Sequence, residues 1–265
     1  MRHCRKLPDG CRGDSEGLMA QCSSRVSLDF GLMKRTLIVG DVHGCREELE
    51  ALLEVASLDD TDDLVFVGDL VARGPDSLGV IDLAIRRQAR AVIGNHERRL
   101  LEIRDSESQG GERVSLSAGY RQLLEELKPE HWTYIRAMPI YLELPQHHAL
   151  VVHAGLLPGV PIERQDPWVL THIRSVESSG EASSRLGRES WATRYMGPTH
   201  VVFGHSAQVG IQLLDHATGL DSGCVYGKRL TGLLLEAEQP IAAVAERGRS
   251  LVSVAARRVH HVPRG

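Results

Sequence analysis

The sequence predicts a mixed α/β fold built on two sheets. Between residues 35 and 93, short apolar runs alternate with amphipathic segments. This alternation is typical of parallel strands joined by right-handed helical crossovers. The second half of the chain holds more strand-like runs than helical segments. A layered fold with two sheets therefore fits the chain better than a simple doubly wound sheet.

In the first half, each expected strand runs into a glycine. Strands are predicted at 36–39, 64–67 and 89–93, where short apolar runs end at Gly40, Gly68 and Gly94. Helices are predicted between them, at 46–56 and 77–87. The first of these carries leucines on one face and charges on the other. Ser77 is the expected cap of the second.

Further elements are expected along the rest of the chain. Helices are predicted at 120–127, 130–137 and 168–175, and a hairpin is predicted from 140–144 and 149–152. More strands are predicted at 201–203, 211–214, 230–235 and 241–245. The polar segments 104–119 and 176–190 are expected to be loops, and the second is rich in Ser, Gly and Glu.

Composition excludes several classes of protein. The 265 residues, 42% of them hydrophobic, are enough to bury a core. No run of about 18 apolar residues is present, so no membrane span is expected. A net charge of −4 and few aromatic side chains argue against bulk nucleic-acid binding. The N-terminus has no apolar secretory core, and a reducing cytoplasm is the expected compartment.

The chain is expected to contain one domain with two tails. Residues 1–34 lack periodicity and are predicted to be a disordered tail, or to lie upstream of a true start at Met33. A single domain is predicted over 35–256, with a C-terminal tail at 257–265. The paired histidines of 147–148 and 260–261 are expected at the surface.

Short polar clusters follow five of the predicted strands. They are Gly40-Asp41-Val42-His43-Gly44, Gly68-Asp69-Leu70-Val71-Ala72-Arg73-Gly74, Gly94-Asn95-His96-Glu97, His153-Ala154-Gly155 and Gly204-His205. Strand ends of α/β sheets are where ligands bind, so these side chains are expected to converge. Carboxylates, an amide oxygen and imidazoles without thiolate suit manganese, iron, zinc or cobalt. Capping and turn formation are the alternative interpretation of the clusters.

In this order, the clusters resemble the motifs of calcineurin-like metallophosphoesterases, within the phosphoprotein phosphatase superfamily. The resemblance covers about residues 35–236 and implies a two-sheet β-sandwich flanked by helices, with two divalent metal ions at one edge. It implies that Asp41 and His43 bind the first metal and that Asp69 bridges both. The second metal would be bound by Asn95, His153 and His205. A buried core histidine is the alternative for His205.

The resemblance also implies a mechanism. A hydroxide bridging the two metals, most naturally Mn, would attack phosphorus in line. Arg73, Asn95 and His96 would bind the substrate phosphate, and His96 would protonate the leaving oxygen. A structural hydrogen bond is the alternative role for His96, and a surface ion pair is the alternative for Arg73.

Two segments, 68–78 and 221–231, resemble bacterial symmetrical diadenosine tetraphosphatases, which implies cleavage to two ADP. Ala72 stands where related protein phosphatases have an Asp that orients the acid histidine. Against this, Glu97 is typical of protein phosphatases, and His153 and His205 are only 52 positions apart. A serine/threonine protein phosphatase acting on phosphoproteins therefore stays open, as does a binding module without activity. Arg174 and Arg194 are candidates for a second phosphate-binding arginine.

Overall fold

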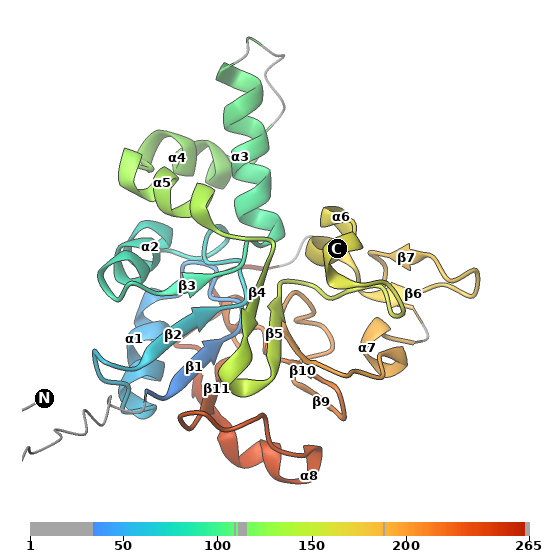
Figure 1. Cartoon of the computed structure of the whole chain (residues 1–265). Helices are drawn as coiled ribbons and strands as arrows, with labels where there is room; N and C mark the ends of the chain where they lie inside the picture. The colour runs from blue at the N-terminus through green and yellow to red at the C-terminus, as the bar shows by residue number, and fades with distance from the viewer. Residues whose placement is uncertain (1–33, 109, 111–115, 188, 263–265) are drawn as a thin grey trace, which may run out of the picture. The chain divides into compact units, whose positions relative to one another are not determined.

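The computed structural model describes residues 34–108, 110, 116–187 and 189–262. Within these residues, two five-stranded sheets form the centre of the fold (Figure 1). The predicted α/β architecture with two mixed sheets and flanking helices is confirmed. The predicted N-terminal tail lies outside the described residues, except for the exposed Lys34.

The first sheet has the strand order β12-β11-β1-β2-β3. Its strands are β1 (Thr36–Val39), β2 (Asp63–Phe66), β3 (Arg90–Ala91), β11 (Arg229–Leu235) and β12 (Leu251–Ala255). Strands β1, β2 and β3 run parallel, as the alternating sequence predicts, and their crossovers are α1 (Arg46–Val55) and α2 (Ser77–Arg86). Strands β11 and β12 extend the sheet in antiparallel pairing.

The second sheet has the order β4-β5-β8-β10-β9. Its strands are β4 (Tyr141–Leu144), β5 (Ala149–Val152), β8 (His200–Phe203), β9 (Gln212–Leu214) and β10 (Ala217–Gly219). Strands β5, β8 and β10 are parallel, and the antiparallel β4 and β9 form the edges. The predicted hairpin of β4 and β5 is confirmed, and it turns through the 3-10 helix η1 (Pro145–His147).

The alternation of side chains along each strand divides the core into layers. On β1, Leu37 and Val39 join the apolar cluster beneath the helices, whereas Ile38 joins the cluster shared by the two sheets. On β8, Val202 faces the same shared cluster, and Phe203 packs in the cluster outside the second sheet. Because neighbouring side chains on a strand point to opposite faces, the central strands β1 and β8 are buried on both sides.

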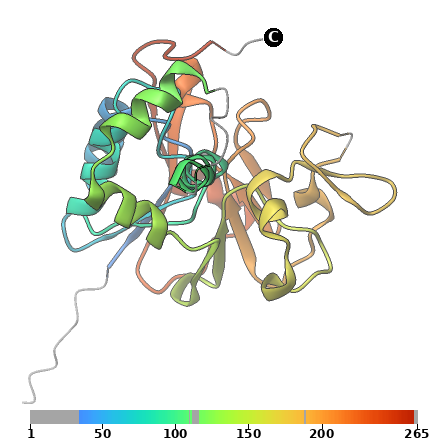
Figure 2. The ribbon, with the colours of Figure 1, turned by 90° about the horizontal axis from the view of Figure 1, so that it is seen from above.

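Helices cover the outer faces and one end of the sheets. Figure 1 shows α1 and α2 on the side of the first sheet, and α6 (Pro167–His172) and α7 (Trp191–Arg194) on the side of the second. Helix α3 (Asn95–Ser108) rises above the sheets and is seen end-on in Figure 2. Helices α4 (Ala118–Glu126) and α5 (Pro129–Ala137) lie on the side of α2. None of the helices in the described ranges is long and apolar enough to cross a membrane.

Two predictions about the helices are wrong. Asp76, not Ser77, caps α2, because its carboxylate accepts from the Gly79 N–H at 2.7 Å. The Ser77 hydroxyl instead accepts from the Ala72 N–H at 3.0 Å and so ties down the preceding loop. Residues 104–108 belong to α3 and not to a loop. Ile103 is buried just before these residues, which are all polar and so carry no apolar period that would indicate a helix.

The second half of the chain differs from the prediction at four places. Helix α6 ends at His172, and 175–176 form strand β6 (Ser175–Val176), which pairs with β7 (Ala182–Ser183) inside the expected loop. The strand expected at 241–245 does not form: residues 241–243 lie in no helix or strand, and helix α8 (Val244–Arg247) begins directly after them. Arg247 is buried there and donates to the carbonyls of Leu214 and Ala242, which fixes the segment in a turn. Strands β10 and β12 were not predicted.

His147 and His260, both expected at the surface, are instead held by polar contacts. His147 is fully buried, where its ring nitrogens contact Gln239 O and Thr36 Oγ1, both at 2.8 Å. His260 contacts the buried carboxylate of Glu48 at 2.8 Å. His148 is exposed, as expected. Pairs of histidines carry no periodic signal, so the sequence could not show which ring turns inward.

Candidate functional site

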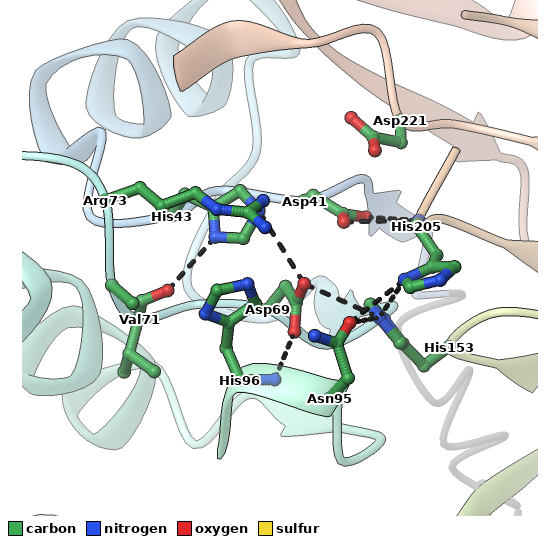
Figure 3. Close-up of polar contacts among 12 residues, drawn as sticks. Asp41, His43, Asp69, Val71, Arg73, Asn95, His96, His153, His205 and Asp221 are labelled. Carbon is green, nitrogen blue, oxygen red and sulfur yellow. Dashed lines mark hydrogen bonds and ion pairs between the residues drawn. The ribbon is translucent and has the colours of Figure 1, made fainter. Parts of the chain in front are cut away.

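The five polar clusters meet at one edge of the two sheets. Residues from four of them, Asp41, Asp69, Arg73, Asn95 and His205, line a cavity of about 470 Å³, and Figure 3 shows how these side chains lie. Asp41 and Asp69 follow β1 and β2 of the first sheet, whereas His153 and His205 follow β5 and β8 of the second. Asn95 is the first residue of α3 and is separated from the end of β3 by residues 92–94. The sequence prediction that these residues lie together is matched by their positions.

Asp69 lies at the centre of the site. Its Oδ2 is 3.6 Å from His43 Nε2 and 3.5 Å from His153 Nε2, so it faces both histidines (Figure 3). Its Oδ1 accepts from the His96 N–H at 3.0 Å. Asp41 lines the same cavity, and both of its oxygens accept from the His205 N–H at 3.1 Å. Asp69 is thus placed between two groups of ligand-type atoms.

Three acceptor atoms converge on the side of the second sheet. His153 Nδ1 lies 2.9 Å from the Val67 carbonyl, to which it must donate, so Nε2 presents a lone pair. That Nε2 lies 3.0 Å from Asn95 Oδ1 and 3.2 Å from His205 Nδ1. Lone pairs that face one another repel unless a proton or a cation lies between them. This donor set fits a divalent cation.

His43 is prepared in the same way on the side of the first sheet. Its Nδ1 lies 3.0 Å from the Val71 carbonyl, to which it donates, and its Nε2 is left to accept. In this structure that Nε2 is 2.8 Å from Arg73 Nη1. A backbone carbonyl that fixes the tautomer of an imidazole is a common support for metal-binding histidines. His43, Asp69 and His96 form one compact group of possible ligands, and Asp69, His153 and His205 form another.

Burial governs the electrostatics of the site. It raises the pKa of Asp69 to about 7, and it raises the pKa of Asp41, which also feels Asp221 and Asp69. It lowers the pKa of His153 to about 4 and the pKa of His43 well below its usual range. Neutral imidazoles are the form that binds metal. The buried carboxylates need positive charge nearby to stay ionised.

The backbone is constrained at the residues that line the site. His43, Asp69, Arg73 and His205 all have left-handed backbone angles, with φ of 48°, 51°, 70° and 67°. Such angles are uncommon for residues other than glycine and tend to occur at functional sites. Gly94 and Gly204 are required for a different reason. A Cβ at either position would collide with a carboxylate oxygen, that of Asp69 or of Asp41 respectively.

Glu97 supports the loop after β2, a role that the sequence did not reveal. Its carboxylate is fully buried and accepts from backbone N–H groups of Asp69, Leu70, Val71 and Gly94, at 2.8 to 3.1 Å. Burial and the nearby Asp69 raise its pKa to about 7. Glu97 therefore shapes the loop that carries Asp69 and Arg73.

The two candidate arginines are in different environments. Arg174 lines the cavity and donates to the carbonyls of Ser184 and His205 at 3.0 and 3.2 Å. Arg194 lies on α7, exposed and paired with Glu189 at 2.8 Å, and does not line this cavity. Arg73 also lines the cavity, as does Lys228. The structure thus brings Arg174, and not Arg194, to the site.

Asp221 is a further residue of the site that the sequence analysis did not single out. It is buried, lines the cavity, and has a pKa raised by burial. It follows β10, in the same strand-then-polar pattern as the other clusters. Because β10 is only three residues long and was not predicted, the pattern was not recognised there.

A sequence profile of calcineurin-like phosphoesterases matches residues 34–209, more than half of the chain. The chain belongs to the calcineurin-like phosphoesterase family. This phosphoesterase is a hydrolase of phosphoester or phosphoanhydride bonds, as predicted. Its family uses divalent metal ions, and the histidine and aspartate groups described above can hold them.

Individual relatives of the phosphoesterase are also similar over most of their length. It is 31% identical to the asymmetrical bis(5'-nucleosyl)-tetraphosphatase PrpE of Oceanobacillus iheyensis, over 79% of the chain and 92% of that protein. It is 30% identical to the protein of the same name from Bacillus cereus, over 74% of the chain and 88% of that protein. A crystal structure described as a candidate diadenosine tetraphosphatase aligns with a TM-score of 0.72 and 36% identity, covering 85% of this chain and 95% of the other.

Proposed function

We propose that this phosphoesterase hydrolyses dinucleoside tetraphosphates, using two divalent cations held at the meeting point of the two sheets. Asp41 and His43 would bind one cation, Asn95, His153 and His205 the other, and Asp69 would bind both. The central observation is the position of Asp69 Oδ2, 3.6 Å from His43 and 3.5 Å from His153. Such cations bind phosphate oxygens and lower the pKa of the water that attacks phosphorus. Oxygen and nitrogen ligands without thiolate favour manganese, with iron, zinc and cobalt as alternatives.

Basic side chains around the cavity would bind the polyphosphate. Arg73, Arg174 and Lys228 line the same cavity as the proposed ligands. Arg73 is exposed, so its guanidinium is available to a phosphoryl group above His43. A planar guanidinium can donate to two phosphate oxygens at once. Three basic groups suit a chain of phosphates better than a single phosphomonoester.

His96 would donate a proton to the oxygen that leaves. Its ring lies beside that of His43, with centroids 4.9 Å apart. Burial keeps the pKa of His96 well below its usual range in the protein alone. A polyphosphate bound next to the ring places negative charge there, which favours the protonated imidazole. The proton donor is therefore formed when substrate binds.

The position of cleavage is the finer part of the proposal. Two short segments of the sequence resemble symmetrical enzymes, whereas the curated relatives are named as asymmetrical ones and match 79% and 74% of the chain. We favour the asymmetrical mode, which yields a nucleoside triphosphate and a monophosphate, because that similarity extends over far more residues.

Product analysis tests the proposal directly. Purified protein is incubated with diadenosine tetraphosphate and manganese, and the nucleotides are separated. ATP plus AMP is the expected result, and two ADP would show the symmetrical mode instead. No turnover of the dinucleotide beside rapid hydrolysis of a phosphopeptide would contradict the proposal and favour a serine/threonine protein phosphatase.

The two arginines provide a matched pair for the substrate-binding part of the proposal. Arg174→Ala should raise KM for diadenosine tetraphosphate about tenfold, since a charge-assisted hydrogen bond contributes about 1.5–3 kcal/mol. Arg194→Ala, an exposed residue in a surface ion pair, should leave KM unchanged. Equal effects of both substitutions on KM would show that Arg174 does not bind the substrate.

A further inference from the structure

A tyrosine from a different helix holds the ring of His96. Tyr120 lies on α4, and its hydroxyl is 2.6 Å from His96 Nδ1. The two rings are parallel to within 6°, with centroids 5.8 Å apart. Burial raises the pKa of Tyr120, so this hydroxyl stays protonated. A hydroxyl can donate to Nδ1 of the neutral imidazole and accept from Nδ1–H of the protonated one.

The hydrogen bond to Tyr120 is the one that fixes the ring. Among the described residues, the ring nitrogens of His96 have no other hydrogen-bond partner, and no carboxylate accepts from them. The peptide N–H of His96 is held separately by Asp69 Oδ1. The backbone position and the ring orientation of His96 are therefore set by different residues.

The pair of rings borders a second cavity. This cavity, of about 550 Å³, is lined by Ala72, Arg73, His96 and Tyr120, among others. Arg73 also lines the cavity of the proposed metal ligands, so it stands between the two spaces. A phosphoryl group held at Arg73 can thus have its reacting phosphorus on one side and its leaving group on the other.

We propose that Tyr120 is a positioning residue that orients the imidazole of His96 toward the leaving oxygen, on the side of this second cavity. The inference rests on the proposed function, in which His96 donates the proton. With Nδ1 held by the tyrosine, Nε2 is the nitrogen that faces the substrate. In the step itself, water adds to phosphorus, the bond from phosphorus to the leaving oxygen breaks, and the proton passes from Nε2 to that oxygen.

Tyr120→Phe tests the hydroxyl alone, because phenylalanine keeps the ring that stacks on His96. The substrates are phenyl phosphate, whose leaving group needs a proton, and 4-nitrophenyl phosphate, whose leaving group does not. We expect kcat for phenyl phosphate to fall about tenfold or more, since general acids contribute about 10²–10⁴. KM, and kcat for the nitrophenyl ester, should change less than about twofold.

Tyr134→Phe is the matched control. Tyr134 is also half-buried, and its hydroxyl donates to the Ala89 carbonyl at 2.8 Å, away from both cavities. It should leave kcat for both esters unchanged. An equal loss of kcat for both esters in Tyr120→Phe, or no loss, would overturn the positioning role. Failure of the wild type to hydrolyse any phosphate ester would instead contradict the proposed function.

A measurement on the folded protein separates the two proposals. In protein with ¹⁵N-labelled histidine, the Nδ1 resonance of His96 should shift in Tyr120→Phe and stay in place in Tyr134→Phe. This readout requires no turnover. An unchanged His96 resonance in Tyr120→Phe would show that the hydroxyl does not hold the ring, even if the enzyme is active.

Discussion

His153 and His96 are both buried imidazoles of the candidate site, but different parts of the molecule hold them. His153 follows β5 of the second sheet, and its Nδ1 contacts the Val67 carbonyl of the first sheet at 2.9 Å. His96 lies in the first turn of α3, and its Nδ1 contacts a side-chain hydroxyl from α4 at 2.6 Å. A backbone partner is fixed by the sheet itself, whereas a side-chain partner can change by substitution. The proposed metal ligands thus depend on the fold, and the proposed proton donor depends on a single neighbouring side chain.

The largest expected effect on turnover comes from replacing a proposed metal ligand. Asp69→Asn removes the charge that faces both histidines, and turnover should fall more than about 10³-fold, because the proposed bridge between the cations is lost. The loss should be the same for good and poor leaving groups. Initial rates with both phenyl esters, together with metal content by elemental analysis, measure this.

Asp63→Asn is a suitable control for Asp69→Asn. Asp63 begins β2, the strand that precedes Asp69, but it is partly exposed and paired with Arg90 at 3.2 Å. It should leave turnover unchanged. Full activity of Asp69→Asn with metal still bound would refute the bridging role.

For His96, the proposed proton donor, we expect an effect that depends on the leaving group. His96→Ala should lower turnover about 10²–10⁴-fold for alcohol leaving groups, and less for nitrophenolate, which leaves without a proton. His148→Ala, at an exposed position, is the control. Equal losses for both classes of substrate would argue that His96 binds phosphate or metal and does not donate the proton.

The sequence predicted the proposed metal ligands better than it predicted the surroundings of His96. Asp41 and Asp69 each follow an apolar run that ends in glycine, so their place at strand ends was visible in the chain. His96 was also found, because it lies next to Asn95 in the same cluster. Its partner Tyr120 was not found, because it lies on another helix, 24 positions away, and no periodic pattern links the two.

The elements of the fold also differ in how well the sequence predicted them. Strands β1 and β2 and the crossover helices α1 and α2 have strong apolar periods and were predicted to within one residue, whereas β3 is shorter than the strand predicted at 89–93. Strand β10 has three residues and α8 has four, so neither repeats its side-chain period often enough for a pattern to be recognised. The burial of Arg247 could not be predicted either, because it contacts the carbonyls of Leu214 and Ala217, at the ends of β9 and β10, which are about 30 positions away.

Glu97 follows His96 in the chain and holds the loop that carries Asp69. Its replacement should lower the free energy of unfolding more than the rate of hydrolysis. Glu97→Gln puts an amide donor where one carboxylate oxygen now accepts from backbone N–H groups. Buried donors left without an acceptor cost about 1–3 kcal/mol, so the free energy of unfolding should fall by that amount. Urea denaturation of the metal-free protein measures it.

Glu102→Gln is the control for Glu97→Gln, since Glu102 lies on the same helix with its side chain 53% exposed. It should change the free energy of unfolding by less than about 0.5 kcal/mol. If both substitutions cost the same, the loop after β2 does not depend on the Glu97 carboxylate.

The smallest expected effect is at a carboxylate outside the site. Burial would raise the pKa of Glu48, but hydrogen bonds from His260 and the Arg257 N–H outweigh it and leave that pKa below the ordinary 4.5. Its stabilising contribution is therefore present above pH 4.5 and is lost as the pH falls through the lowered value. Wild type should be more stable than Glu48→Gln at pH 7, and thermal unfolding should show the difference shrinking below pH 4.5.

Glu47→Gln is the control that distinguishes the contact of Glu48 from a general effect of surface charge. Its carboxylate pairs with Arg257 at 3.1 Å, but both side chains are more than 60% exposed (66% and 63%). Exposed pairs contribute about 0–1 kcal/mol, so Glu47→Gln should have little effect at any pH. A Glu48→Gln difference that does not vary with pH would show that the carboxyl acts there through packing and not through charge. A difference that shrinks with falling pH would instead show that residues 257–260 are held to α1 by one ionised group, in contrast to the many backbone contacts that hold the strands.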